Sequence, residues 1–313
     1  MEEARRVQMI ENSTIVEESA WRRAKVTVGR TKGYAAALYM SGLTSGCSLG
    51  LSLKAGEQQR ELDSAIADIA KRSALDDSDA GYERWRTPYG HFWIPKRRLS
   101  RESLFDMLGE RRLEVYGGRR RGVQKGDVVL DCGSNIGTFV SEALAAGASQ
   151  VVACEPSPGN VECVRRNFAG ELATGRVILY PRGLWHEATT LRLGLGASPA
   201  GDSFLRESTD GIGLPVTTID TVVSELAFNR IDFIKMDIEG AERNALQGGR
   251  ATIGRFRPRL AVSAYHLLDD PQVLTSEVTK AFARYKLHCE RVRLVTSGLL
   301  HSRIAPLVYF FEP

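Results

Sequence analysis

Residues 127–137, Asp-Val-Val-Leu-Asp-Cys-Gly-Ser-Asn-Ile-Gly, place a carboxylate and two glycines where an apolar strand runs into a helix. A dinucleotide-binding loop has the pattern Gly-x-Gly-x-x-Gly, whose glycines let the backbone approach a pyrophosphate. Here Asp131 replaces the first glycine, and its charge would repel a pyrophosphate. The same charge suits a cationic ligand such as S-adenosylmethionine, which carries a sulfonium and an ammonium group. The pattern Asp131-x-Gly133-x-x-x-Gly137 therefore predicts a loop that binds a methyl donor.

A second acidic residue, Glu155, ends the next predicted strand. A carboxylate at this place in dinucleotide folds accepts hydrogen bonds from ribose hydroxyls, although Glu155 could also cap the following helix. In the glycine loop, Ser134 and Asn135 offer further polar contacts to the donor. Gly183 and Leu184 follow the third strand, where we expect the adenine.

The segment 234–242, Ile-Lys-Met-Asp-Ile-Glu-Gly-Ala-Glu, brings charged side chains to the end of another apolar strand. Lys235, Asp237 and Glu239 fall where open α/β sheets bind their ligands, outside the carboxyl ends of the strands. Methyltransferases that act on the amino groups of bases or amides carry an Asn/Asp-Pro-Pro-Tyr motif at this place, and the sequence has none. The segment therefore predicts a catalytic site for an acceptor other than such a nitrogen.

Three segments together resemble the FkbM family of S-adenosylmethionine-dependent methyltransferases: residues 131–137, Thr-Thr-Ile-Asp at 217–220, and Lys-Met-Asp-Ile-Glu-Gly-Ala-Glu at 235–242. The resemblance covers about residues 85–313. It implies the class I methyltransferase fold, S-adenosylmethionine as cofactor, and O-methylation of a hydroxyl on a small molecule, sugar or glycolipid. The polar segment 191–215 departs from the family, so the acceptor does not follow from the resemblance.

Methylation of an aliphatic hydroxyl requires a group that takes its proton, and a positioned general base accelerates such a step by about 10²–10⁴-fold. The candidates are Asp237, Glu239 and His266, the last just past the fifth strand. Asp237 could instead bind the amino group of the donor, Glu239 could cap a helix, and His266 could be structural. A divalent metal bound by Asp237 with the pair Asp269-Asp270 is an alternative means of lowering the acceptor pKa, although Asp residues before Pro271 commonly start a helix.

From residue 126 onward, apolar strands alternate with amphipathic helices. This order predicts an α/β fold with a Rossmann-like, seven-stranded, doubly wound sheet whose last strand is antiparallel, because no helix separates the last two strands. The expected strands are 128–131, 151–155, 177–182, 233–237, 259–264, 286–293 and 307–311, and the expected helices are 138–146, 158–168, 241–248 and 273–284.

Three regions are expected along the chain. Residues 1–80 form a mostly helical extension, with a helix over 58–73 that ends at an acidic turn, 76–79. Residues 81–125 form an aromatic and basic cap or lid, and residues 126–313 form the methyltransferase domain.

Within the extension and the cap, two segments carry more specific expectations. The aromatic residues and turn residues of 82–95 predict a β-hairpin. The uncharged segment 33–53 follows basic residues and is long enough for a membrane anchor, which leaves membrane association as an alternative. Its many Ser, Thr and Gly residues favour a soluble segment instead.

Composition is that of a globular protein, with 43% hydrophobic and 26% charged residues in 313. The net charge of +4 comes with short arginine runs but no nucleic-acid-binding module, so a nucleic acid is not an expected partner. Five cysteines form no Cys-x-x-Cys pair and are odd in number, which predicts neither a disulfide framework nor a zinc site. A cytoplasmic location is expected on this ground.

Two other classes of function stay open beside the methyltransferase. The chain could bind the donor without turnover, or act as a scaffold recruited to a membrane. The complete set of Asp131, Gly133, Gly137 and Glu155 favours an enzyme, and Asp131 disfavours a nicotinamide oxidoreductase. We therefore expect a small-molecule or carbohydrate hydroxyl as the acceptor.

Overall fold

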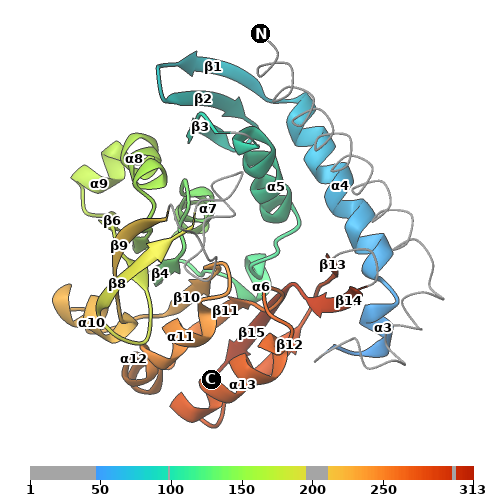
Figure 1. The fold of residues 1–313 in the computed structure, drawn as a ribbon, viewed down its shortest axis with the longest axis vertical. Coiled ribbons are helices and arrows are strands. Elements are labelled where there is room, and N and C mark those ends of the chain that lie inside the picture. Colours follow the sequence, from blue (N-terminus) through green and yellow to red (C-terminus); the bar gives the residue numbers. More distant parts are fainter. Residues whose placement is uncertain (1–46, 98, 195–210, 298–300) are drawn as a thin grey trace, which may run out of the picture.

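The computed structural model describes residues 47–97, 99–194, 211–297 and 301–313, and its centre is a seven-stranded sheet (Figure 1). The sheet strands are β4 (Val128–Cys132), β5 (Gln150–Cys154), β6 (Val177–Tyr180), β10 (Phe233–Met236), β11 (Arg259–Ser263), β12 (Lys286–Cys289) and β15 (Val308–Glu312). Their order is β12-β15-β11-β10-β4-β5-β6. β15 is antiparallel to both of its neighbours and all other pairs are parallel, which confirms the predicted fold class.

Helices cover both faces of this sheet, as its apolar strands require. The residues of β4 and β10 are all buried. One face packs against α10 (Ile219–Glu225), α11 (Glu242–Gln247), α12 (Arg250–Phe256) and α13 (Asp270–Ala281). The other face packs against α7 (Thr138–Ala145) and α8 (Pro158–Asn167), and α9 (Ala169–Ala173) follows α8. The four predicted helices are confirmed, with α13 starting three residues earlier than expected because Pro271 occupies its first turn.

The described part of the N-terminal region consists of helices and a small antiparallel sheet. Its elements are α3 (Leu49–Ser52), α4 (Ala55–Lys71), β1 (Ala74–Ser78), β2 (Tyr82–Thr87), β3 (Gly90–Pro95), α5 (Ser100–Arg112) and α6 (Gly118–Arg121). β2 and β3 form the hairpin predicted over 82–95. The acidic segment 76–79 was expected to be a turn, and this expectation is wrong: most of it lies in β1, where Asp76 and Asp77 face Arg84 of β2 at 2.7 and 3.8 Å.

A separate apolar cluster attaches this region to the sheet domain. Ile69 of α4, Phe92 of β3 and Leu104 of α5 pack together with Ile136, which belongs to the glycine loop. The N-terminal region is therefore built against the loop that the sequence assigns to the methyl donor.

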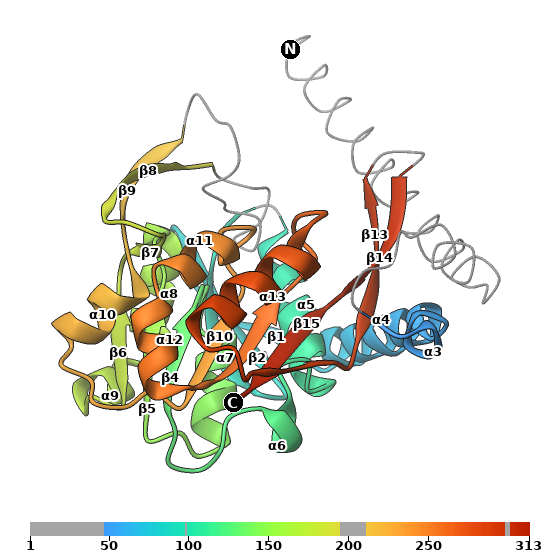
Figure 2. The ribbon, with the colours of Figure 1, turned by 90° about the horizontal axis from the view of Figure 1, so that it is seen from below.

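Two further pairs of strands lie outside the main sheet. The expected single strand over 286–293 is wrong, because β12 ends at Cys289 and β13 (Val292–Ser297) turns away to pair with β14 (His301–Pro306). Figure 2 shows this hairpin leaving the sheet beside α4, where the Val292 backbone N–H donates to Gln58 Oε1 at 2.9 Å. A small three-stranded sheet is formed by β7 (Gly183–Leu184), β8 (Thr189–Leu193) and β9 (Ile212–Thr217). β8 and β9 include the two ends of the polar segment 191–215, whose residues 195–210 lie outside the described residues.

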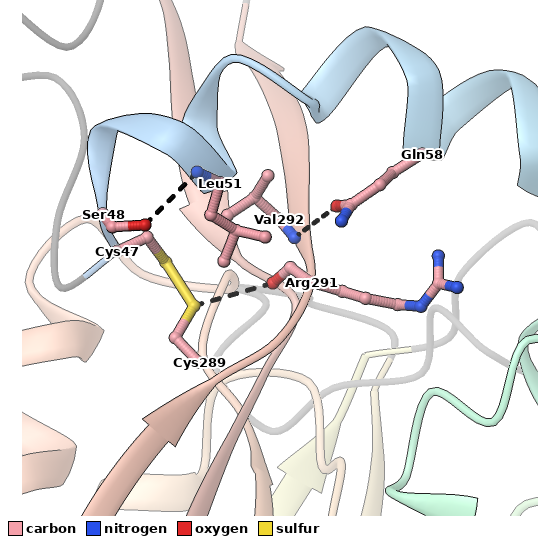
Figure 3. Close-up of a disulfide and its surroundings, with 7 residues drawn as sticks. All are labelled: Cys47, Ser48, Leu51, Gln58, Cys289, Arg291 and Val292. Carbon is pink, nitrogen blue, oxygen red and sulfur yellow. Dashed lines mark hydrogen bonds between the residues drawn. A yellow bond between two sulfur atoms is a disulfide. The ribbon is translucent and has the colours of Figure 1, made fainter.

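A disulfide joins Cys47, at the start of the described chain, to Cys289 at the end of β12 (Figure 3). The expectation that the cysteines form no disulfide is therefore wrong. The pair is separated by 242 residues, so only the folded chain brings the two together. Cys132, Cys154 and Cys163 are buried free thiols.

Within the described ranges, no helix has the length and apolarity needed to cross a membrane. Most of the segment 33–53 lies outside these ranges, and its described end contributes α3.

Candidate active site

A cavity of about 260 Å³ opens where β4, β5 and β10 end, with α5 along one side. Of the residues predicted from the sequence, it is lined by Gly133, Ser134, Asn135, Glu155, Gly183, Leu184, Asp237 and Glu239. Asp131, Gly137 and His266 lie behind this lining. The structure therefore brings the predicted donor residues and two of the predicted catalytic residues to one cavity.

The glycine loop requires its glycines. Gly133 has φ +81°, and a Cβ there would lie 2.1 Å from the carbonyl oxygen of Asp237. Gly137 has φ +91°, and a Cβ there would lie 2.2 Å from the ring of Phe168. Both the dihedral angle and the close approach exclude a side chain, so the loop packs tightly against the chain after β10 and against α8.

Asp131 lies beneath the loop, with its side chain fully buried. Lys235 Nζ is 3.2 Å from Asp131 Oδ1 and donates a hydrogen bond of 2.8 Å to the carbonyl of Gly133. Burial raises the pKa of Asp131, an effect that Lys235 opposes. Lys235 lines the cavity where the sequence led us to expect Asp131, so the carboxylate neutralises Lys235 and supports the loop from below.

Glu155 links the loop to the start of α8. Its Oε2 accepts the backbone N–H of Asn135 at 2.9 Å, and its Oε1 accepts the backbone N–H of Ser157 at 2.9 Å. Oε1 also accepts a hydrogen bond from the side-chain amide of Asn160 at 3.3 Å, and Glu155 lines the cavity. Asn135 itself has φ +52°, a conformation uncommon outside glycine, and its Oδ1 accepts the N–H of Ile136 at 2.8 Å.

The predicted catalytic residues converge around His266. Its Nε2 lies 3.6 Å from Asp237 Oδ1 and 3.7 Å from Glu239 Oε2, and its Nδ1 lies 3.1 Å from Glu242 Oε1. Glu242 is fully buried and also accepts the backbone N–H of Ile238 at 2.8 Å. Tyr116 donates its hydroxyl to Asp237 Oδ2 at 2.7 Å. Tyr116 and His266 thus approach the two oxygens of the Asp237 carboxylate, one each, at the cavity wall.

Burial and neighbouring charges shift the pKa values of His266, Glu239 and Asp237 in different directions. Burial alone would lower the pKa of His266, but Glu242, Asp237 and Glu239 raise it to about 10. Burial raises the pKa of Glu239 to about 8, although His266 opposes the shift. Burial likewise favours the protonated form of Asp237, but Lys235 and His266 outweigh it and lower the pKa. Among the three carboxyl groups around His266, Glu239 is the one whose pKa is raised toward the range in which a general base is effective.

On the side of α5, the cavity wall is formed by residues that the sequence did not single out. Burial raises the pKa of Glu110 to about 7, with Asp237 adding to the shift and Arg293 opposing it. Arg293, from β13, stacks over the ring of Tyr265 at 4.3 Å. Glu110 and Arg293 carry no motif, and only the packing of α5 and β13 brings them here.

Glu242 was within reach of sequence reasoning, and Asp269 and Asp270 were already candidates. Glu242 is the last residue of the predicted catalytic segment, four positions after Ile238, and an acidic residue in the first turn of α11 is a helix-start signal. Asp269 and Asp270, the alternative metal ligands beside Asp237, are both bound by Arg243, at 2.6 and 2.9 Å. They start α13 instead.

The strand order, the glycine loop and the cavity at the strand ends define the class I methyltransferase architecture. The methyltransferase FkbM domain matches residues 131–287, 157 of the 313 residues, and the chain belongs to the FkbM methyltransferase family.

Solved structures with a similar fold are distant in sequence. The methyltransferase FkbM from Methylobacillus flagellatus is 20% identical over 83% of this chain and 60% of its own, with a TM-score of 0.44. Trm5b from Pyrococcus abyssi is 14% identical over 77% and 56%, with a TM-score of 0.39. Precorrin-6Y C5,15-methyltransferase from Geobacter metallireducens is 13% identical over 70% and 92%, with a TM-score of 0.37. The chain spans less than two thirds of the length of the first two, and no curated protein matches it.

Proposed function

We propose that the protein is an S-adenosylmethionine-dependent O-methyltransferase that acts on a hydroxyl of a small molecule, sugar or glycolipid. The observation that carries this proposal is the shared cavity, in which the glycine loop and Glu155 lie beside Asp237 and Glu239. A donor site and a proton-accepting site must adjoin for methyl transfer to an alcohol, and membership of the FkbM family supports methyl transfer as the reaction.

The donor side of the cavity fits S-adenosylmethionine in shape and in hydrogen-bonding groups. Gly133 lets the loop pass close to the backbone of Asp237, and Ser134 and Asn135 line the cavity where the methionine part would lie. Glu155 would accept the ribose hydroxyls, and Gly183 and Leu184 would contact the adenine. When bound, S-adenosylmethionine supplies a methyl group that moves to the acceptor oxygen while the electron pair of the broken carbon–sulfur bond stays on sulfur.

On the acceptor side, a carboxylate takes the hydroxyl proton. We assign this role to Glu239, because it lines the cavity two residues after Asp237 and its pKa is raised to about 8. Asp237 stays ionised and is oriented by Tyr116 and His266. Alignment of donor and acceptor in such a site contributes up to about 7–11 kcal/mol to lowering the barrier.

The proposal assigns residues 126–313 to the methyltransferase domain, residues 81–125 to a cap, and residues 1–80 to an extension. It keeps the cytoplasm as the expected location, where the methyl donor is available, although the Cys47–Cys289 disulfide is typical of oxidising compartments. Alkylation of free thiols during lysis of cells in denaturant distinguishes the two: five labelled cysteines indicate a reducing compartment, and three indicate an oxidising one.

The bond formed in the product tests the proposal. The protein is incubated with S-adenosylmethionine carrying a labelled methyl group and with a panel of hydroxylated sugars, phenols and glycolipids. We expect label in a product that survives alkali, as an ether does. Label in an alkali-labile ester or on nitrogen would contradict O-methylation of a hydroxyl, and donor binding without transfer to any acceptor would favour the non-catalytic alternative.

A further inference from the structure

The spacing around His266 Nε2 does not match hydrogen bonding. Asp237 Oδ1 and Glu239 Oε2 lie 3.6 and 3.7 Å away, beyond the usual range of a hydrogen bond. Two ligand atoms bound to one metal ion at about 2.0–2.2 Å each are separated from one another by roughly 3–4 Å. Each carboxylate oxygen therefore lies from Nε2 at the separation of two ligands that share an ion, and Asp237, Glu242 and His266 offer ligand atoms within 4.8 Å of one another.

Their orientation is fixed by partners on the opposite side. His266 Nδ1 is 3.1 Å from the fully buried Glu242, whose carboxylate is itself held by the backbone N–H of Ile238. Metal-binding histidines commonly present their second ring N–H to a carboxylate in this way. Asp237 is oriented similarly, because Tyr116 donates a hydrogen bond to its Oδ2 and its Oδ1 faces His266.

The ring nitrogen that points into the cluster is buried and has no hydrogen bond. The side chain of His266 is 9% exposed, and among the described residues its Nε2 has no hydrogen-bond partner. The same holds for Asp237 Oδ1. Buried polar atoms in folded proteins are almost always paired, so two such atoms facing each other indicate a bound group between them.

The carboxyl groups around His266 also favour binding of a cation. Asp237, Glu239 and Glu242 surround one imidazole. The neighbouring ammonium group of Lys235 is engaged by Asp131 and by the carbonyl of Gly133. Arg293 lies near Glu239 and Asp237 as a further cation, and a divalent ion at His266 would add two positive charges among the three carboxyl groups.

We propose that His266 Nε2, Asp237 Oδ1 and Glu239 Oε2 form a binding site for a divalent cation, with Glu242 fixing the imidazole from behind. A mixed set of one imidazole and two carboxylates suits Mn²⁺, Fe²⁺ or Zn²⁺. Asp237 and Glu239 line the cavity, so the remaining coordination positions face the acceptor side. The cation would bind the acceptor hydroxyl and lower its pKa, the proton leaving to solvent, so that Glu239 would act as a ligand in place of its role as the base. This role of the cation rests on the proposed function, whereas binding of the ion does not.

Titration of the chelator-treated full-length protein with Mn²⁺ alone, followed by electron paramagnetic resonance, tests the site. We expect one ion per chain and a ¹⁴N coupling from a directly bound imidazole in the unsubstituted protein. Glu242→Gln should weaken binding by about 10–100-fold, the usual effect of losing the group behind a histidine ligand. His266→Gln should remove the nitrogen coupling. His288→Gln is the matched control, because His288 also lies beside a carboxylate, Glu312 at 3.3 Å, but outside the cavity.

Binding by the unsubstituted protein without ¹⁴N coupling would overturn the assignment even if a variant failed to fold, and so would no binding at all. Glu239→Gln separates the roles of that residue: if turnover is lost while Mn²⁺ affinity is unchanged, Glu239 acts as a base only and the ligand set is wrong. Separate titration with S-adenosylmethionine keeps this test independent of the proposed function. Mn²⁺ binding without donor binding would overturn the methyltransferase proposal and support the metal site.

Discussion

The carbonyl oxygen of Asp237 lies so close to Gly133 that a Cβ on residue 133 would fall 2.1 Å from it. This contact joins the loop proposed to bind the methyl donor to the segment proposed to take the acceptor proton. The two were separate motifs in the sequence, and their distance from each other is fixed by the parallel pairing of β4 with β10. Donor and acceptor chemistry therefore depend on one backbone contact.

Gly133→Ala should abolish donor binding and destabilise the fold. The variant forces a side chain into a backbone atom and into a left-handed conformation, effects that cost about 1–3 and about 1–2 kcal/mol respectively. Chemical unfolding and donor titration measure the two losses. Gly126→Ala is the control, because Gly126 has φ +88° but nothing within 4 Å of an added Cβ. Equal losses in the two variants would show that the contact with Asp237 is unimportant.

Tyr116→Phe should lower kcat by about tenfold or more while leaving donor affinity nearly unchanged. The variant removes the hydroxyl that donates to Asp237 Oδ2, and a hydrogen bond to a charged group contributes about 1.5–3 kcal/mol. Tyr285→Phe removes a comparable hydroxyl, bonded to the carbonyl of Pro258 at 2.6 Å, away from the cavity. Steady-state kinetics measure kcat for both variants. The role of Tyr116 would be contradicted if Tyr116→Phe left kcat unchanged, or if both variants lowered kcat by the same factor.

Glu142 should make stability depend on pH. Burial raises its pKa from 4.5 to about 7, with Arg111 opposing the shift. The folded chain therefore binds more protons at this site than the unfolded chain between about pH 4.5 and 7, so the free energy of unfolding falls as pH rises through this window and levels off above it.

Glu142→Gln should remove that slope and stabilise the protein by about 1–3 kcal/mol at pH 8. Urea unfolding from pH 4.5 to 8 measures the difference between the variant and the parent protein. Glu187→Gln, at an exposed site, is the control. A difference between Glu142→Gln and the parent that does not change with pH would contradict the assignment.

Loss of the Cys47–Cys289 disulfide should lower the free energy of unfolding by about 2–4 kcal/mol, because the bond closes a loop of more than two hundred residues in the unfolded chain. Thermal unfolding of the parent protein in dithiothreitol and of the Cys47→Ser/Cys289→Ser variant without it should give the same, lower Tm. Dithiothreitol should have no effect on the variant. A parent Tm that is insensitive to reduction would show that the bond does not stabilise the fold.

The central sheet could be predicted from the sequence because its strands are short apolar runs between helical patterns. Residues 128–132 illustrate this, since all of them are buried. The glycine loop could be predicted as well, because Gly133 and Gly137 stand at positions with positive φ, a conformation that other residues rarely adopt.

Features that depend on pairing between segments far apart in the chain could not be predicted from the sequence. Asp131 and Lys235 both stood out in the sequence, but their ion pair follows from the register that places them side by side on β4 and β10. Cys47 and Cys289 are joined across 242 residues, and spacing alone does not determine such a pairing. The strand β1 forms from an acidic segment because Arg84 on β2 compensates its charge.

Calorimetric titration of the purified protein with S-adenosylmethionine, and in parallel with NADH, tests the central claim most directly. The account predicts binding of S-adenosylmethionine at micromolar concentration and no binding of NADH, because the loop lacks the first glycine of the dinucleotide pattern, where Asp131 stands. Binding of NADH, or of neither ligand, would contradict it.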